Sequence, residues 1–526
     1  MLLEISGITA LPDEGEGGLP DKVAAVLGVP AGRIGSLKVI RRSVDARRRR
    51  PPRFVYILEA SLPDDISWAA KPADGVTVRP APEREAPSFP PMTAESGQRP
   101  VVIGCGPAGL FAALTLARRG MPPLLLERGK SVDERVADVH RFWNDGMLDP
   151  ESHVHFGEGG AGTFSDGKLT ARARHSHTGW VKQVFVEMGA PASILTDSRP
   201  HIGTDRLREV VVRLREKLLE LGCEVRFGAK ATDFLTRRGR IAGVAVNFAE
   251  EIRTRRLILA VGQSADDTYR LLQEKGVRLE PKPFAVGLRV EHPQALINEI
   301  QYGKWRRNPA LPPADYFLTA RAGTTNRSVY TFCMCPGGQI IGCSAEPGGM
   351  VTNGMSHFRR DGRYANSAVV VNVRTGDFQG DDPLGGLAFR RFWERKAFLQ
   401  GGGGYRAPAQ RLTDFLEERD NGTVGMTSFL PGVRAAPLRD VLPRFAGVSL
   451  KEGFRQFERK MPGFITGEAH LVGVETRTSS PVRITRGADG QSVTVAGLYP
   501  CGEGAGYAGG IVSSALDGIR AALCVG

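Results

Sequence analysis

The sequence predicts an α/β fold whose parallel sheet is formed by segments from the middle and the end of the chain. A short apolar strand begins at Val101, a helix with one apolar face follows it, and a second strand covers residues 123–127. A buried strand at residues 257–261 and a final apolar helix at residues 511–521 continue this pattern. Between these two segments, longer strands alternate with helices, which predicts an α+β domain inserted into the first domain.

The beginning of the chain predicts a small β-α-β-β module. Strands are expected at residues 2–8, 34–40 and 54–62, and a helix is expected at residues 20–27. A proline-rich segment without periodicity, typical of an extended linker, follows. The expected division is an N-terminal module at 1–77, a linker at 78–98, the first part of the parallel-sheet domain at 99–283, an inserted substrate or cap domain at 284–473, and the second part of the parallel-sheet domain at 474–526.

Composition is that of a globular protein of several domains. The 526 residues exceed one compact core, and 41% hydrophobic and 24% charged residues are ordinary values. The start of the chain lacks the features of a signal peptide, and no apolar stretch approaches the length that spans a membrane. We therefore expect a cytoplasmic protein without membrane insertion. Its seven scattered cysteines do not suggest a disulfide framework.

About half of the net charge of +13 comes from one segment, residues 41–53, which contains seven arginines and one aspartate. A solvated hairpin loop explains this segment, and a surface for an anionic partner is the alternative. A nucleic-acid partner is therefore possible but not favoured. The sequence gives no oligomeric state.

The strongest local motif is a glycine-rich turn between a strand and a helix. Gly104 permits the tight turn, Gly106 lets the backbone approach a pyrophosphate, and Gly109 lets helix and sheet pack closely. The helix N-terminus offers free N–H groups to the phosphates. Glu127 ends the next strand, where an acid can bond a ribose diol. Together these features predict a dinucleotide site.

The dinucleotide is indicated by resemblance. Gly-x-Gly-Pro-Ala-Gly followed by Glu127-Arg128 resembles the FAD fingerprint of the glutathione-reductase-like flavoproteins, which have a Rossmann-type domain. A threonine, a buried strand, Gly262 and Asp266 resemble a second segment of that superfamily. Gly502-Glu503 resembles its C-terminal segment, where an acid bonds the flavin ribityl chain, although the usual residue there is aspartate. FAD is a long molecule, and its two ends need sites from opposite ends of the chain.

Two further segments complete the predicted FAD site. The glycine spacing at residues 158–168 lets backbone N–H groups converge on pyrophosphate or flavin, and a purely structural turn is the alternative. The helix after Gly510 can direct its N-terminus at the flavin ring. The residues predicted to bind FAD are Gly104, Gly106, Pro107, Ala108, Gly109, Glu127, Arg128, Gly160, Thr163, Asp166, Ala231, Gly262, Asp266, Gly502, Glu503, Gly510 and Ile511.

A closer resemblance covers most of the chain. Residues 156–169, 332–338, 352–355 and 475–481 are similar to the signatures of a bacterial family of FAD-dependent dehydrogenases whose reaction is not established. The N-terminal module, including residues 42–47, is similar to the module of that family. The resemblance supports the cofactor and the fold more than any substrate.

Lys168 and Arg477 are the candidate catalytic residues. Each belongs to a segment that flanks flavin-binding sequence, where a cation can attract an acidic substrate and stabilise the reduced ring. For Arg477, a structural ion pair with Glu475 is an equal alternative.

No metal site is expected. Cys333, Cys335 and Cys343 lack a fourth ligand at metal-binding spacing, and residues two apart on a strand are poorly placed for a disulfide. Packing thiols are the favoured interpretation, and redox work is the alternative.

The sequence thus predicts an FAD-dependent oxidoreductase of the dehydrogenase or reductase type. It transfers hydride or electron pairs between a small-molecule substrate and flavin N5. The substrate is expected to be acidic if Lys168 and Arg477 face it. A second nucleotide fingerprint is missing, so stable NAD(P) binding in a separate domain is not expected, and NAD(P)H remains a candidate only as a transient electron donor. The alternatives are an FAD-dependent RNA-modifying enzyme and a non-catalytic flavin-bearing redox sensor.

Overall fold

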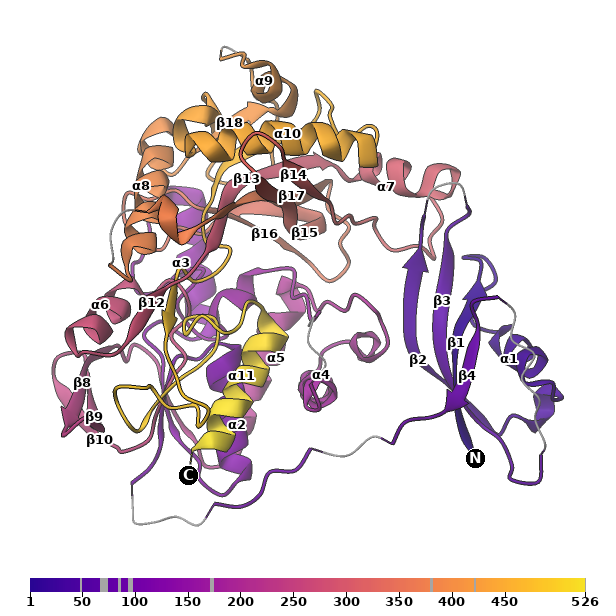
Figure 1. Ribbon diagram of the computed structural model, residues 1–526, viewed down its shortest axis with the longest axis horizontal. Helices are drawn as coiled ribbons and strands as arrows, with labels where there is room; N and C mark the ends of the chain where they lie inside the picture. Colours follow the sequence, from indigo (N-terminus) through magenta and orange to yellow (C-terminus); the bar gives the residue numbers. More distant parts are fainter. Residues whose placement is uncertain are drawn as a thin grey trace.

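The computed structural model describes residues 1–47, 50–66, 74–83, 87–92, 98–170, 175–378, 382–420 and 422–525. A small N-terminal module lies to one side of a larger body made of two main sheets (Figure 1). Arg48, Arg49 and part of the predicted linker lie outside the described residues.

The N-terminal module is a four-stranded antiparallel sheet in the order β2-β3-β1-β4 with one helix. Alternate residues of β3 are buried, so one face of the sheet packs with the helix in an apolar core. The predicted β-α-β-β pattern is confirmed, and β4, in the proline-rich segment, was missed. The elements are β1 (Leu2–Ala10), α1 (Leu19–Leu27), β2 (Ser36–Asp45), β3 (Arg53–Ser61) and β4 (Thr77–Pro80).

The arginine-rich segment contributes to contacts within the protein. The backbone N–H of Arg42 donates to the carbonyl of Thr196 at 2.8 Å, and its guanidinium pairs with Asp197 at 2.9 Å. Arg47 and Arg53 lie 2.6 and 3.6 Å from the Asp45 carboxylate. Three arginines of this segment therefore have carboxylate partners, and one of these contacts joins the module to the body.

The larger body contains the predicted parallel sheet. Its five strands lie in the order β22-β11-β5-β6-β7, and all neighbours are parallel. The order reverses between β5 and β11, which is the position where doubly wound α/β sheets bind ligands at the carboxyl ends of their strands. The strands are β5 (Val101–Ile103), β6 (Leu124–Leu126), β7 (Glu224–Arg226), β11 (Leu257–Leu259) and β22 (Leu498–Pro500).

Helices from distant parts of the chain pack together beside this sheet. Helices α2 and α11 lie side by side in Figure 1, and Gly518 makes their close approach possible, because a Cβ there would lie 2.0 Å from the carbonyl oxygen of Ala108. The C-terminal helix is therefore part of the same unit as β5. The helices of this unit are α2 (Pro107–Arg118), α3 (Val132–Asp145), α4 (Thr178–Glu187), α5 (Thr204–Glu220), α6 (Asp266–Glu274) and α11 (Ile511–Cys524).

A second, eight-stranded sheet lies in sequence between β11 and β22. Its order is β14-β15-β17-β13-β20-β18-β19, with β16 paired to β15. Its strands are β13 (Phe284–Pro293), β14 (Thr319–Ala322), β15 (Arg327–Gly342), β16 (Thr352–Ser356), β17 (Tyr364–Val373), β18 (Ala407–Arg411), β19 (Val433–Ala435) and β20 (His470–Glu475). Its helices are α7 (Gln294–Tyr302), α8 (Gly385–Gln400), α9 (Leu412–Glu417) and α10 (Arg444–Lys460).

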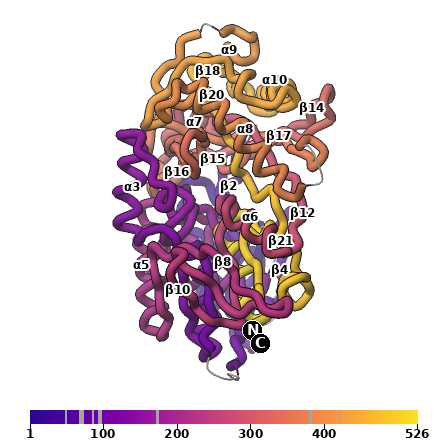
Figure 2. The backbone as a smooth tube through the Cα atoms, turned by 90° about the vertical axis from the view of Figure 1, so that its left-hand side faces the viewer, coloured from indigo at the N-terminus to yellow at the C-terminus, as the bar shows by residue number. Residues whose placement is uncertain are grey.

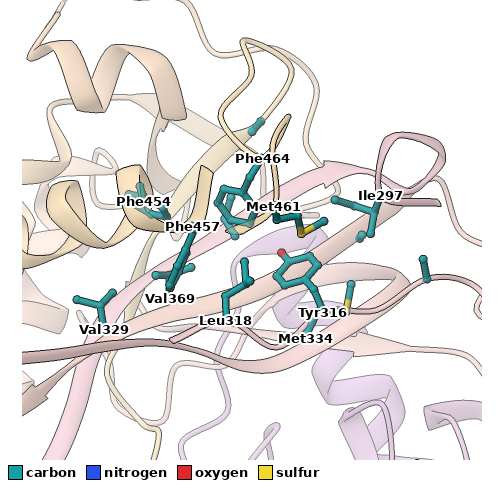
Figure 3. Packing of buried hydrophobic residues seen from close by; sticks show 14 of the residues in the cluster. Ile297, Tyr316, Leu318, Val329, Met334, Val369, Phe454, Phe457, Met461 and Phe464 are labelled. Carbon is teal, nitrogen blue, oxygen red and sulfur yellow. The ribbon is translucent and has the colours of Figure 1, made fainter. Parts of the chain in front are cut away.

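Helix α10 covers one face of the second sheet. Phe454 and Phe457 of the helix pack with Val329, Val369 and Phe464 in one fully buried apolar cluster (Figure 3). In Figure 2 the strands of the second sheet and α10 occupy the upper part of the molecule, and α5 of the parallel-sheet unit lies below them.

Helix α3 joins the two units. Trp143 and Phe142 pack against Ile341 and Met355 of the second sheet, and Trp143 Nε1 donates to the carbonyl of Gly342 at 2.8 Å. The body also contains a three-stranded sheet of β8 (Ala231–Arg237), β9 (Arg240–Val246) and β10 (Glu250–Arg253), and a pair of β12 (Leu279–Pro281) with β21 (Val482–Ile484).

Candidate functional site

The glycine-rich turn after β5 has the geometry that the sequence predicts. Gly104 has φ +100°, and a Cβ there would lie 2.3 Å from the carbonyl oxygen of Ala260. A Cβ on Gly109 would lie 1.8 Å from the carbonyl oxygen of Gly104. At Gly106 the nearest atom to a Cβ would be the Cα of Gly160, 3.8 Å away. Gly104 and Gly109 are therefore needed for chain packing, whereas Gly106 leaves backbone open to a ligand.

Three segments far apart in the sequence converge on this turn. The 3₁₀ helix η2 (Gly160–Phe164) approaches α2, since a Cβ on Gly160 would lie 3.0 Å from the Cα of Gly106. A Cβ on Gly162 would lie 3.3 Å from the Ile511 side chain at the start of α11. A Cβ on Gly502 would lie 2.8 Å from the Cβ of Ala108. The predicted Gly160 and Gly502, with Gly162, thus let these segments approach the turn closely, and the place where they meet is called the cradle below.

Two helix N-termini open at this cradle. Helix α2 begins at Pro107 after the N-cap Gly106, and α11 begins at Ile511 after the N-cap Gly510. No side chain among the described residues caps either helix. Uncapped N-terminal N–H groups and the positive ends of the helix dipoles favour an anionic ligand.

Glu127 ties three loops together at the carboxyl end of β6. Its carboxylate accepts hydrogen bonds from the backbone N–H groups of Cys105 at 2.7 Å, Gly129 at 2.9 Å and Gly157 at 3.0 Å. The residue is 5% exposed. Each carboxylate oxygen has more than one acceptor position, so a ribose hydroxyl can still be accommodated. Glu127 is therefore a structural hub of the loops as well as a candidate ribose ligand.

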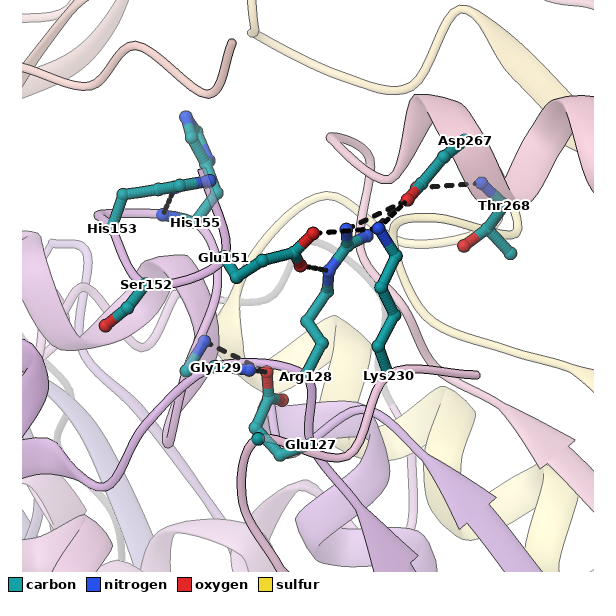
Figure 4. Close-up of polar contacts among 12 residues, drawn as sticks. Glu127, Arg128, Gly129, Glu151, Ser152, His153, His155, Lys230, Asp267 and Thr268 are labelled. Atoms are coloured by element: carbon teal, nitrogen blue, oxygen red, sulfur yellow. Dashed lines mark hydrogen bonds and ion pairs between the residues drawn. The ribbon is translucent and has the colours of Figure 1, made fainter. Parts of the chain in front are cut away.

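A cavity of about 250 Å³ opens beside Glu127. Arg128 pairs there with Glu151 at 2.7 Å and with Asp267 at 2.9 Å, and Lys230 reaches the same two carboxylates at 2.8 and 2.9 Å (Figure 4). Ala231 follows Lys230 at the start of β8. The cavity is lined by Arg128, Lys130, Asp149, Glu151, Ser152, Gly228, Lys230 and Asn247. Its size, mixed charge and position suit the adenosine end of a dinucleotide.

Asp266, a predicted FAD ligand, forms an ion pair with an arginine of the inserted part of the chain. Its buried carboxylate pairs with Arg390 of α8, and the same guanidinium donates to the carbonyl of Gln263 at 2.9 Å. The side-chain oxygens of Gln263 and Ser264 are buried without a hydrogen-bond partner among the described residues. Gln263 and Ser264 follow Gly262 directly, and their two oxygens can form hydrogen bonds with a bound polar group.

Glu503 lies next to these unpartnered atoms. Its Oε1 accepts a hydrogen bond from Gln263 Nε2 at 2.8 Å, and Gln263 Nε2 also donates to the carbonyl of Arg477 at 2.8 Å. Burial raises the pKa of Glu503 to about 7, and the positive charge of Lys282 opposes the shift only in part. At neutral pH this carboxyl can therefore both accept and donate hydrogen bonds.

Thr163 and Asp166 fix the loop around η2. The Thr163 hydroxyl donates to the carbonyl of Glu158 at 3.1 Å. Asp166 is buried and accepts hydrogen bonds from Arg360 at 2.6 and 2.9 Å and from the hydroxyl of Ser356, both from the second sheet and the loop that follows it. Burial opposes ionisation of Asp166, but Lys168 and Arg360 lower its pKa below the usual range. Both predicted ligands thus hold the loop in place.

Lys168 is half-buried, and its ammonium lies 2.9 Å from Asp166 and 3.8 Å from Cys335 Sγ. Burial acts against its charge, but the negative charge of Asp166 outweighs burial and raises the lysine pKa. Lys168 therefore stays charged where the η2 loop meets the second sheet.

The alternative of a structural ion pair between Arg477 and Glu475 is wrong. Arg477 pairs with Glu394 of α8 at 2.9 and 3.0 Å, while Glu475 pairs with Arg289 of β13 at 3.0 Å. Glu475 and Arg477 are two residues apart, and each forms an ion pair with a different residue on a neighbouring element. Arg477 is buried, and only its Nη1 lacks a partner among the described residues.

Several residues of this region carry no motif in the sequence. Arg390 and Glu394 lie one turn apart on α8, a spacing that usually indicates an exposed ion pair, but both are buried and face different partners. Gln263, Lys230 and Asp267 also had no distinguishing signal. In the described part of the chain, no group of three or more histidine, cysteine or acidic side chains could hold a metal, and no helix is long and apolar enough to cross a membrane.

Comparison with known proteins gives matches at three levels. Residues 283–478 match a model described as "FAD-dependent protein, C-terminal domain-like", and residues 2–61 match a domain of unknown function. A protein of Clostridium beijerinckii, itself described as uncharacterized, is 42% identical over 524 residues, which cover 99% of this chain and 98% of the relative.

Solved structures overlap at low identity. A complex of CtdE with FAD is 12% identical, covers 80% of this chain and 82% of its own, and has a TM-score of 0.31. A geranylgeranyl bacteriochlorophyll reductase-like protein of Thermoplasma acidophilum is 12% identical, covers 81% and 76%, and has a TM-score of 0.36. The flavin-dependent brominase Bmp2 is 13% identical, covers 81% and 77%, and has a TM-score of 0.34.

Proposed function

The chain belongs to a family of FAD-dependent proteins, and from that premise we propose that it is an FAD-dependent oxidoreductase of the dehydrogenase or reductase type. The observation that carries the proposal is the cradle at which residues 104–109, 160–162 and 502–511 converge with two uncapped helix N-termini. Together these segments suit the pyrophosphate and the flavin end of one long anionic cofactor.

The residues fit FAD as follows. Glu127, Arg128 and Ala231 would hold the adenosine end at the cavity beside β6. The N-terminus of α2 and the glycines at 160 and 502 would hold the pyrophosphate. Gly262, Glu503 and the N-terminus of α11 would hold the flavin end, where unpartnered oxygens of Gln263 and Ser264 also lie.

The bound cofactor would supply the transfer of electron pairs, and the protein residues would set its surroundings. The N-terminus of α11 and the charge of Lys168 favour negative charge on this side of the cradle. Glu503 would hold a proton below about pH 7. Asp166 and Glu127 keep the loops rigid, so the site is formed before a ligand binds.

The domain division follows the same logic. We assign the FAD-binding domain to residues 99–283 and 474–526, because β5 to β11 and β22 share one sheet. The domain at 284–473, with the second sheet, would face the flavin and bind a small-molecule substrate. The N-terminal module at 1–77 and the linker at 78–98 would lie outside the cofactor site. NAD(P)H would serve as the transient electron donor. The protein would act in the cytoplasm.

Anaerobic reduction of the purified protein tests the reaction type. NADH, NADPH and a panel of organic acids and other metabolites would be mixed with it while flavin bleaching is followed. We expect at least one donor to bleach the flavin stoichiometrically, and turnover to require a second substrate. Bleaching by none of the donors, with full FAD content, would favour a non-catalytic flavoprotein over the proposed enzyme.

A further inference from the structure

An exposed tyrosine lies on the C-terminal segment assigned to the flavin end of the site. Tyr507 is 38% exposed, and two guanidinium groups lie over its ring, that of Arg486 at 3.9 Å and that of Arg483 at 5.3 Å from the ring centroid. The backbone N–H of Arg486 also donates to the Tyr507 hydroxyl at 3.3 Å. The ring is therefore fixed in position while part of it stays open to solvent.

Asp517 of α11 connects this tyrosine and its two arginines to the cradle. Its carboxylate accepts two hydrogen bonds from the Arg486 guanidinium, at 2.6 and 2.9 Å, and a third from the backbone N–H of Gly502 at 2.8 Å. Arg483 lies beside the same segment, because a Cβ on Gly506 would lie 3.1 Å from the Cα of Arg483. The tyrosine ring is therefore held next to the backbone that would bind the flavin end of the cofactor.

A lysine shares one face of the β12–β21 pair with Arg483. The two strands are antiparallel with Glu280 opposite Arg483, and the backbone N–H of Lys282 continues the ladder by donating to the carbonyl of Pro481 at 2.8 Å. Successive side chains of a strand point to opposite faces, so Lys282 and Arg483 are diagonal neighbours on one face. The other face of β21 is buried in an apolar core. The outer face of this strand pair therefore carries two adjacent cations.

These two cations are not neutralised by acidic side chains. In the part of the chain that the structure describes, neither Lys282 nor Arg483 forms an ion pair, and Arg483 Nε is buried without a hydrogen-bond partner. Glu280 lies opposite Arg483 but pairs with Arg278 at 3.4 Å. Burial and then the charge of Arg483 lower the pKa of Lys282, and the charge of Glu503 opposes this shift. Two like charges held together in this way favour an anionic ligand.

We propose that Lys282, Arg483 and Tyr507 form a docking site for a nucleoside diphosphate. The ammonium and the guanidinium bind the phosphate oxygens, because charge-assisted hydrogen bonds to phosphate are short and strong. The exposed part of the Tyr507 ring stacks with the base, because every base offers a flat π-face to an aromatic side chain. A pair of uncompensated cations beside one exposed ring thus matches the two chemical parts of this ligand.

The part of this site in electron delivery rests on the proposed function. A nicotinamide nucleotide contains a nucleoside diphosphate, and the site lies beside the segment that would hold the flavin end of FAD. The sequence has no second nucleotide fingerprint. A nucleotide donor would therefore bind here by its phosphates and one base, and it would leave the partly exposed surface after the reaction. Binding of the nucleoside diphosphate itself does not depend on electron transfer, so the two proposals can fail separately.

The first test is titration calorimetry of the flavin-loaded protein with ADP and with inorganic pyrophosphate. We expect ADP to bind, and we expect Arg483→Gln and Lys282→Gln each to weaken the binding of both probes about tenfold, the scale of one lost charge-assisted hydrogen bond. Tyr507→Leu should weaken the binding of ADP but not of pyrophosphate. Arg253→Gln removes an exposed arginine of β10 and is the matched control, which should bind both probes as wild type does. Flavin absorbance reports the integrity of every variant.

The second test measures electron delivery under anaerobic conditions. NADH or NADPH would be mixed with the flavin-loaded protein, and the rate of flavin bleaching would be followed at increasing donor concentration. Arg483→Gln should raise the donor concentration that gives the half-maximal rate and leave the limiting rate near that of wild type, because a phosphate contact is present before and during the reaction. A lower limiting rate at an unchanged half-maximal concentration would overturn the docking role.

The outcomes separate this site from the proposed function. ADP binding that none of the three substitutions weakens would place the nucleotide elsewhere and overturn the site. Absence of ADP binding at full FAD content would also overturn it, while bleaching by another donor would leave the proposed flavoenzyme intact. Conversely, a protein that holds no FAD but binds ADP and pyrophosphate through Arg483 would support the site and contradict the proposed function.

Discussion

Replacement of Glu127 by alanine should affect both the fold and the cofactor, and the structure allows the two effects to be separated. The carboxylate accepts three backbone hydrogen bonds from loops at residues 105, 129 and 157. A hydrogen bond to a charged group contributes about 1.5 to 3 kcal/mol, and bonds that share one carboxylate are not additive. We therefore expect the free energy of unfolding of the apo-protein to fall by about 3 to 6 kcal/mol.

The change in the free energy of FAD binding should be smaller than the change in unfolding free energy, and it is measured separately. Loss of one charged ribose partner corresponds to about 1.5 to 3 kcal/mol, or a ten- to hundredfold weaker affinity. Urea unfolding of the apo-protein gives the first quantity, and FAD titration of the folded apo-protein gives the second.

A matched control is available in the same cavity. Glu151 is also a carboxylate near Arg128, but it is partly exposed, and among the described residues its carboxylate accepts hydrogen bonds only from the side chains of Arg128 and Lys230. Glu151→Gln should lower the free energy of unfolding by less than about 1 kcal/mol. If Glu127→Ala left unfolding unchanged, the three backbone contacts would be refuted, and if it left FAD affinity unchanged, the ribose role would be refuted.

Three further predictions follow from the ion pairs. Lys168→Met should keep its FAD while donor-driven bleaching slows about tenfold, equivalent to about 1.4 kcal/mol, whereas an unchanged rate would place Lys168 outside the reaction. Arg477→Met leaves Glu394 buried without its cation, so it should lower the free energy of unfolding by about 3 to 5 kcal/mol, and a stable variant would contradict the pairing. Deletion of residues 1–90 removes the Arg42–Asp197 contact but no residue of the proposed cradle, so the remaining chain should fold and hold FAD, and loss of FAD would show that the module contributes to the site.

The same group of predictions includes one of pH dependence. The folded pKa of Glu503, about 7, lies above the usual 4.5, so folding favours its protonated form. Its contribution to stability is therefore full below about pH 4.5 and is lost as pH rises to about 7, by about 1 to 3 kcal/mol in the apo-protein. Urea unfolding at several pH values should show this loss, and Glu503→Gln should remove it; an equal slope in both proteins would refute the shift.

The sequence predicted those parts of the fold that local patterns determine. The strand, glycine turn and helix from Val101 to Arg118 are encoded by neighbouring residues, and so is the packing requirement at Gly104 and Gly109. Strand β4 was missed because its residues lie at the start of a proline-rich segment, and because it pairs with β1, more than 70 residues away in sequence.

Partners of the buried charges could not be predicted in the same way. Asp266 and Arg477 were identified as polar residues near flavin-like segments, but their partners, Arg390 and Glu394, lie on α8 in the inserted part of the chain. The pairing of Arg289 with Glu475 depends on the register of two strands nearly two hundred residues apart. Such contacts arise only when distant elements pack, so the local sequence does not predict them.

The FAD content of the purified protein tests the central claim most directly. The protein would be denatured, and the released cofactor would be identified by chromatography and quantified against chain concentration. The cradle at residues 104–109, 160–162 and 502–511 predicts one non-covalently bound FAD per chain, with a flavin absorption spectrum before release. A colourless protein that cannot be reconstituted with FAD would contradict the account.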